Sequence, residues 1–261
     1  MGEKTYSNRG YKKEAWKWFR NGTINFREVL CFLLPWSFLR RLPWSFRLPS
    51  KNTVMKLFGN PFLVPMPIRN VSAFFDGIKS IIFCNQYHVE LIHDGVIVDA
   101  GANMGIFSVF VAIKHPNATI LAFEPTPLIF EALQENVKYY PNIKAFNCGL
   151  GEKQGKASLV INDRFFSSNH IGEGGIPVDI QTIDGLNTRV DFLKIDTEGY
   201  EANILKGATE TIRKWKPVIA MSAYHKPEDK TELPALLNSI APYDCELWHN
   251  YEDDFICTPL P

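Results

Sequence analysis

The sequence predicts an α/β fold with a mostly parallel sheet, on the basis of three observations. Residues 96–99 and 119–124 are apolar runs, each short enough to be a buried strand and each ending on a carboxylate. Two glycines, Gly101 and Gly105, follow the first run. The apolar block 106–113 comes next and suits a helix packed on a sheet. This order is that of a strand–turn–helix–strand unit, which connects parallel strands.

The glycine turn is suited to a ligand that lies against the main chain. Gly101 and Gly105 carry no Cβ, so the backbone can turn tightly there. The helix that follows points its first amide groups at the same place. Glu124 lies 19 residues beyond Gly105, about where the ribose-binding acid of nucleotide-binding βαβ units is found. A carboxylate at this position can accept hydrogen bonds from both ribose hydroxyls.

The spacing argues against a dinucleotide cofactor. A pyrophosphate cradle usually reads G-x-G-x-x-G, whereas the pattern here is D-x-G-x-x-x-G, with Asp99 in front of the turn. An acid at this point would repel a phosphate and would suit a cationic or amino group. S-adenosylmethionine carries a sulfonium, an amino-acid head and a ribose but no phosphate, and it is therefore the predicted cofactor. The competing interpretation is a tight turn that binds nothing.

Three segments resemble, in order, the motifs of one known family. DAGANMGIFS at residues 99–108, FEPTPLIFEALQENV at 123–137 and FLKIDTEGYEANILKGA at 192–208 are similar to those of the FkbM family of S-adenosylmethionine-dependent methyltransferases. The resemblance covers roughly residues 90–261. It implies a Rossmann-like class I methyltransferase fold, with a seven-stranded, mostly parallel sheet and an antiparallel last strand. The activity it most often implies is O-methylation of hydroxyls on sugars or natural products.

The ends of the later strands carry further candidate residues. Ligands bind at the carboxyl ends of strands in open α/β sheets, so Asp196, Glu198 and His225 are expected to face the transferred methyl group. The resemblance places adenine contacts at Asn147, Cys148 and Gly149, although the acid often found there is absent. The candidate cofactor-binding residues are therefore Asp99, Gly101, Asn103, Gly105, Glu124, Pro125, Asn147, Cys148 and Asp196.

Methyl transfer to a hydroxyl is an in-line displacement at carbon, which a base near the acceptor assists. Asp196, Glu198 and His225 are the candidates for this base. His225 is preferred because the ordinary pKa of imidazole lies closest to neutrality; a hydrogen-bonding or capping role is its alternative. Asp196 and Glu198 could instead hold Mg²⁺ through their oxygens. Two acids so close in sequence are slight grounds for that, and no metal ligand is assigned.

An insertion is expected between the core units. Residues 157–161 and 177–183 alternate as two strands of a hairpin, and the glycine- and serine-rich stretch 164–175 joins them. A loop beside the cofactor is a common place for substrate recognition. A plain connector is the alternative.

Three regions are expected along the chain: a basic aromatic extension at 1–56, a connecting or cap segment at 57–95 and the cofactor-binding domain at 96–261. Residues 1–56 hold 12 of the 28 Lys and Arg, three of the 28 acids and four of the six Trp. Basic residues interleaved with Trp, Phe and Leu over residues 16–47 suit peripheral contact with a membrane interface. Packing on the catalytic domain is the alternative. Tyr87 and His88, in the cap segment, could face the pocket.

Five cysteines without a C-x-x-C pair predict reduced thiols, no zinc site and a cytoplasmic protein, for which the basic aromatic extension adds membrane association as an alternative. The polar start of the chain predicts no signal peptide. The predicted function is thus an S-adenosylmethionine-dependent O-methyltransferase acting on a saccharide, glycan or related small molecule. The alternatives are an RNA methyltransferase that holds phosphates with the basic extension, which the resemblance does not favour, and a non-catalytic cofactor-binding scaffold.

Overall fold

The computed structural model describes residues 53–65, 74–162, 169–249 and 251–261, together with Lys17 and Arg20. The predicted basic extension and its candidate membrane contact therefore lie almost entirely outside the described residues. Within the described parts of the chain, no helix has both the length and the apolar character needed to cross a membrane.

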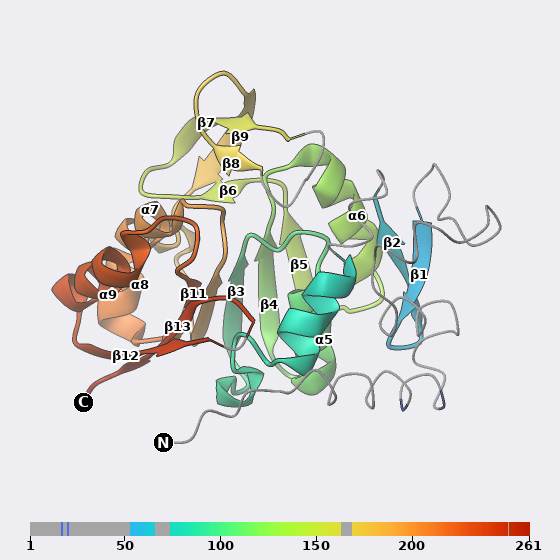
Figure 1. Cartoon of the computed structure of the whole chain (residues 1–261), viewed down its shortest axis with the longest axis horizontal. Helices are drawn as coiled ribbons and strands as arrows, with labels where there is room; N and C mark the ends of the chain where they lie inside the picture. The colour runs from blue at the N-terminus through green and yellow to red at the C-terminus, as the bar shows by residue number, and fades with distance from the viewer. Residues whose placement is uncertain (1–16, 18–19, 21–52, 66–73, 163–168, 250) are drawn as a thin grey trace.

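A seven-stranded sheet forms the centre of the molecule (Figure 1). In chain order its strands are β3 (Val96–Ala100), β4 (Thr119–Phe123), β5 (Ile143–Phe146), β10 (Phe192–Ile195), β11 (Val218–Ser222), β12 (Tyr243–Trp248) and β13 (Asp254–Pro259). Their order across the sheet is β12-β13-β11-β10-β3-β4-β5. β13 runs antiparallel to both of its neighbours, while the pairs from β11 to β5 are parallel. The predicted class I sheet with an antiparallel last strand is confirmed.

Helices cover both faces of this sheet, which explains why its strands are apolar without alternation. Ile97 and Ile120 point into the core that contains α5 (Ile106–Lys114) and α6 (Pro127–Val137). Their neighbours Val98 and Leu121 point into a second core on the other face. That core is closed by the helices α7 (Glu201–Lys206), α8 (Thr209–Trp215) and α9 (Asp229–Ile240).

The predicted insertion forms a small sheet of its own, which lies above the seven-stranded sheet in Figure 1. Its strands are β6 (Gly149–Leu150), β7 (Gly155–Val160), β8 (His170–Ile171) and β9 (Ile176–Gln181), in the order β6-β9-β7-β8. β7 and β9 pair antiparallel, as expected for a hairpin. Because β6 follows β5 almost directly, this sheet stands at the carboxyl ends of the parallel strands.

A hairpin of β1 (Thr53–Leu57) and β2 (Asn60–Val64) precedes the core. The buried Asn136 of α6 holds it, because its side chain accepts a hydrogen bond from the Leu63 amide and donates one to the Leu63 carbonyl. A π-helical segment at Ile78–Phe83 and short 3-10 helices at Val89–Leu91 and Asp184–Leu186 complete the described structure.

The prediction that the cysteines are all reduced is wrong. Cys245 and Cys257 face each other across β12 and β13, with Cα atoms 4.1 Å apart, and form a disulfide. Cys84 and Cys148 are free and buried. Adjacent antiparallel strands bring directly opposed side chains close enough for such a bond, and this register is not visible in the spacing of the sequence.

Candidate active site

The glycine turn after β3 is built as the sequence predicts. Gly101 and Gly105 both have positive φ, +77° and +95°. A Cβ on Gly101 would lie 1.9 Å from the backbone oxygen of Asp196, and a Cβ on Gly105 would lie 2.8 Å from a side-chain carbon of Leu133. Gly101 thus lets the turn lie against the end of β10, and Gly105 lets α5 approach α6.

A cavity opens at the carboxyl ends of β3, β4 and β10, between the two sheets. Backbone and carboxylate groups from three turns line one part of it, and the small sheet contributes an apolar wall. The lining residues are Gly101, Asn103, Phe123, Glu124, Pro125, Thr126, Gly149, Leu150, Leu159, Asn169, His170, Ile171, Asp196, Thr197, Glu198 and Tyr200. This is the crevice in which ligands of open α/β sheets bind.

Glu124 joins two of these turns. Its buried carboxylate accepts hydrogen bonds from the Asn103 amide at 3.0 Å and from the Thr126 amide at 2.8 Å. Burial raises its pKa despite these two donors. Each carboxylate oxygen has a second lone pair, so Glu124 can still accept from a diol placed in the cavity.

The structure corrects the predicted role of Asp99. Its side chain is fully buried beneath the turn, with Oδ1 3.1 Å from Nζ of Lys194 and Oδ2 accepting a hydrogen bond from Ser108 at 2.6 Å. Lys194 also donates to the Gly101 carbonyl at 2.7 Å. The cation that faces Asp99 is therefore a residue of the protein, and Asp99 supports the turn without lining the cavity.

Two further cofactor candidates, Asn147 and Cys148, do not line the cavity. Asn147 donates to the Glu124 carbonyl at 2.9 Å, and the Cys148 thiol is buried, which raises its pKa to about 11. Within the described residues, the wall at this place is made instead by Leu150 of β6 and by Leu159 and Ile171 of the small sheet. Of the three residues expected at adenine, Asn147 and Cys148 lie outside the cavity lining, whereas Gly149 lines it.

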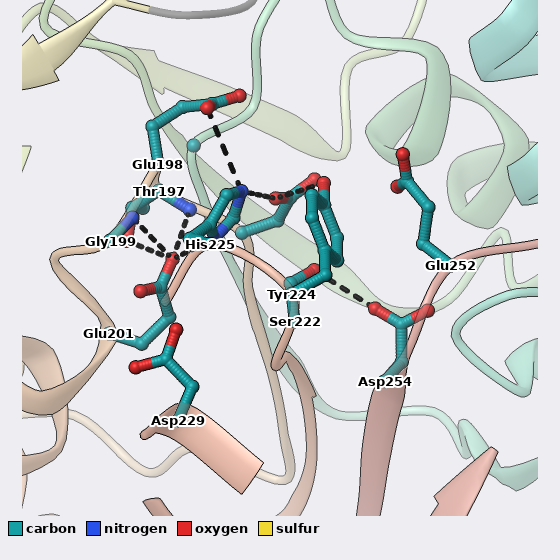
Figure 2. Close-up of polar contacts among 12 residues, drawn as sticks. Thr197, Glu198, Gly199, Glu201, Ser222, Tyr224, His225, Asp229, Glu252 and Asp254 are labelled. Atoms are coloured by element: carbon teal, nitrogen blue, oxygen red, sulfur yellow. Dashed lines mark hydrogen bonds and ion pairs between the residues drawn. The ribbon is translucent and has the colours of Figure 1, made fainter. Parts of the chain in front are cut away.

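The three predicted catalytic residues lie together: Glu198 and His225 are neighbours in Figure 2, and Asp196 approaches the same imidazole. The His225 ring is enclosed, with 7% of its side chain exposed. Its Nε2 atom lies 3.7 Å from Oδ1 of Asp196 and 3.7 Å from Oε2 of Glu198, while its Nδ1 atom lies 3.0 Å from Oε1 of Glu201. Asp196, Glu198 and Glu201 come from the segment that leaves β10, and His225 follows β11.

Asp196 is held by two tyrosines. Tyr87 donates its hydroxyl to Oδ2 at 2.8 Å, and Tyr224 donates to Oδ1 at 3.2 Å. Burial opposes the charge of Asp196, but Lys194 and His225 together leave its pKa lowered. The imidazole of His225 lies 3.7 Å from both Asp196 and Glu198, so the pair gains no support as a Mg²⁺ site.

One other group of potential metal ligands occurs among the described residues. Ligand atoms of Glu201, His225 and Asp229 lie within 4.8 Å of one another. Glu201 already accepts hydrogen bonds from the amides of Thr197 and Gly199, and Asp229 accepts one from the Lys226 amide. Because the fold itself uses these carboxylates, we assign no metal to them.

The protonation of His225 differs from the sequence prediction. Burial disfavours its charge, but the contact with Glu201 and the field of Asp196 outweigh burial and raise its pKa to about 9. His225 is therefore a cation at neutral pH. The preference for His225 as base rested on the ordinary pKa of imidazole, and the site does not keep that value, because an imidazole among three carboxylates is protonated more readily than a free one.

Two residues of this network were not predicted. Glu201 touches His225, and Lys194 compensates Asp99. Glu201 lies in the motif that ends in GYEANILKGA, but only its position in the first turn of α7 brings it beneath His225. Lys194 lies in an otherwise apolar strand and is buried. A buried lysine requires a partner, so its position in the sequence indicates an ion pair.

A comparison with models of protein families identifies the family of the chain. The model of the methyltransferase FkbM domain matches residues 99–247, more than half of the chain. The chain belongs to the FkbM methyltransferase family. The matched residues include Gly101, Glu124, Asp196, Glu198 and His225.

Individual FkbM relatives are similar over part of their length. Methyltransferase 1 of Beauveria bassiana is 30% identical over 44% of this chain and 58% of that protein. The hexuronic acid methyltransferase AglP of Haloferax volcanii is 29% identical over 55% of this chain and 63% of that protein. The matched part of the chain thus spans about three fifths of these relatives. The crystal structure of a methyltransferase FkbM from Methylobacillus flagellatus superposes with a TM-score of 0.52 at 22% identity, covers 74% of this chain and 55% of that one, and shows the shared fold.

Proposed function

We propose that the protein is an S-adenosylmethionine-dependent O-methyltransferase whose acceptor is a hydroxyl of a saccharide or a related natural product. One observation carries this proposal. A single cavity is lined both by the bridging carboxylate of Glu124 and by Asp196 and Glu198, behind which His225 lies 3.7 Å from each of these two acids. The first arrangement suits a ribose, and the second offers acid–base groups to an acceptor.

The described residues suit S-adenosylmethionine in charge and shape. Glu124 would hold the ribose hydroxyls, and the apolar wall of Leu150, Leu159 and Ile171 would lie against adenine. When bound, the cofactor supplies an electrophilic methyl group on a cationic sulfur. Asp196, charged and fixed by two tyrosine hydroxyls, favours a cation at the other end of the cavity.

The choice of oxygen as acceptor atom rests on the cluster and on the family. A hydroxyl holds its proton tightly, and carboxylates with an imidazole are groups that can take that proton up or share it. The relative AglP is named for methylation of a hexuronic acid, a molecule whose nucleophilic heteroatoms are oxygens. No described feature favours RNA, because the carboxylates of Asp196 and Glu201, whose pKa values are lowered, lie here and would repel phosphates.

The direct test is incubation of the full chain with S-adenosylmethionine and a panel of neutral sugars, uronic acids, small polyols and a short RNA. Mass spectrometry would detect an added methyl group, and nuclear magnetic resonance would locate it. We expect an O-methyl ether on a sugar or polyol. Methylation of the RNA, or of a nitrogen atom in any acceptor, would contradict the proposal.

Replacement of His225 by alanine is expected to lower turnover by about 100-fold or more, in the range of acid–base contributions, while cofactor affinity stays within a few fold. The reason is that the imidazolium organises Asp196, Glu198 and Glu201, whereas it does not line the cavity itself. His249→Ala is the matched control, since His249 is exposed. Turnover equal to wild type in His225→Ala would remove His225 from the mechanism.

A further inference from the structure

Glu198 occupies an unusual place in the cluster. It lines the cavity and has a positive φ of +55°, and Gly199 after it has a φ of +92°. A positive φ is uncommon for a residue that is not glycine, and here it belongs to a residue that lines the cavity. Its side chain is 34% exposed, so the carboxyl group faces both the cavity and the His225 ring.

The other carboxylates nearby have partners that Glu198 lacks. Asp196 accepts from two tyrosine hydroxyls, Glu201 accepts from Thr197 and Gly199, and Glu252 accepts from Gln86. Among the described residues, the carboxyl group of Glu198 makes one polar contact, in which its Oε2 atom lies 3.7 Å from Nε2 of His225. It is therefore the acid of the group whose charge is least compensated.

The groups that face Glu198 come from every element packed around it. They are Asp196 from the end of β10, Glu201 from the start of α7, His225 from the segment after β11 and Glu252 from the loop before β13. Lys226 is also close, but its ammonium group is bonded to the Gly199 carbonyl. Three carboxylates thus oppose the ionisation of Glu198, and one imidazolium favours it (Figure 2).

We propose that Glu198 is protonated in the free protein and ionises when the sulfonium of S-adenosylmethionine enters the cavity, so that a carboxylate able to take the acceptor proton exists only in the cofactor complex. This inference rests on the proposed function. Burial and the negative field of Asp196 raise the pKa of Glu198 to about 8, which agrees with a proton held at neutral pH. A cation in the cavity opposes that field and favours the carboxylate.

The charges balance over the reaction. The acceptor oxygen forms a bond to the methyl carbon, the carbon–sulfur bond breaks and its electron pair stays on sulfur. The hydroxyl proton passes to the Glu198 carboxylate. The positive charge of the sulfonium and the negative charge of Glu198 disappear together, and Glu198 is again protonated beside a neutral thioether. The acid would then be set for the next cofactor molecule.

The test is calorimetric titration of the full chain at pH 6.5 in phosphate and in imidazole buffer. The dependence of the observed heat on the ionisation enthalpy of the buffer gives the protons released on binding. S-adenosylmethionine is compared with S-adenosylhomocysteine, which has a neutral thioether in place of the sulfonium. At this pH the α-amino group of the ligand is already largely protonated, so it adds little.

We expect release of about one proton with S-adenosylmethionine and at least fivefold less with S-adenosylhomocysteine. Glu198→Gln should bind the cofactor without release, while Glu131→Gln, at an exposed position of α6, should behave as wild type. Equal release with both ligands, or unchanged release in Glu198→Gln, overturns the inference. If Glu198→Gln does not fold, the two ligands on wild type still decide. Absence of cofactor binding by folded wild type would overturn the proposed function as well.

Discussion

Replacement of Gly101 by alanine is expected to abolish binding of S-adenosylmethionine. An added Cβ would lie 1.9 Å from the Asp196 carbonyl oxygen, an atom of the backbone that cannot rotate away. The φ of +77° is also unfavourable for alanine by about 1–2 kcal/mol. Either the turn or the end of β10 must shift, and both line the cavity. We expect the dissociation constant to rise by about 100-fold or more, equivalent to roughly 2.7 kcal/mol.

Gly59→Ala is the matched control for this change. Gly59 lies between β1 and β2, has a φ of +88° and has no atom within 4 Å of an added Cβ. It therefore carries the backbone cost without the collision, and its cofactor affinity should equal that of wild type. Isothermal titration calorimetry measures both affinities, and circular dichroism checks folding. A Gly101→Ala protein that binds as tightly as wild type would contradict the described geometry of the turn.

Lys194→Met is expected to lower the free energy of unfolding by about 3–5 kcal/mol, the usual effect of removing one partner of a buried ion pair. The side chains of Lys194 and Asp99 are 4% and 0% exposed, and their charged atoms are 3.1 Å apart. Without the ammonium group, the charge of Asp99 would stay buried with Ser108 as its remaining side-chain donor. Chemical denaturation followed by circular dichroism measures this loss.

Two companion variants separate this effect from a general loss of packing. The double variant Asp99→Asn with Lys194→Met removes both charges and keeps an oxygen that can accept the Ser108 hydrogen bond. A large part of the lost free energy of unfolding should therefore return. Lys156→Met breaks an exposed pair with Asp179 and should change stability by about 1 kcal/mol or less. Equal losses in Lys194→Met and Lys156→Met would show that the buried pair is not what supports the turn.

The sequence was sufficient for the central sheet because its signals are local. Buried parallel strands are apolar without interruption, and Glu124 and Asp196 follow β4 and β10 directly. The glycine turn was predictable for the same reason. The positive φ values of Gly101 and Gly105 are favoured by the residue type itself and do not depend on which strand pairs with β3.

Features that depend on register between strands were not predictable. Lys194 is the direct neighbour of Asp99 across β10 and β3, and this pairing turns a supposed ligand-binding acid into half of a buried ion pair. The register of β12 and β13 likewise places Cys245 directly opposite Cys257. Neither partner can be read from its distance along the chain.

The prediction for His225 shows a related limit. Its place at a strand end was foreseen, and so was the approach of Asp196 and Glu198. Its pKa was not, because the contact that contributes most to its charge is with Glu201, whose position depends on how α7 begins. Charge state in a crowded site depends on all neighbours at once, whereas a motif shows only some of them.

Calorimetric titration of S-adenosylmethionine into the wild type and Glu124→Gln tests the cofactor site most directly. Glutamine offers one acceptor oxygen to two backbone amides and has no charge, so the bridge between Asn103 and Thr126 cannot be kept. We predict one-to-one binding by wild type, an affinity lower by about 100-fold or more in folded Glu124→Gln, and wild-type affinity in Glu131→Gln. A folded wild-type protein that does not bind the cofactor, or equal binding by Glu124→Gln, would contradict the proposed site.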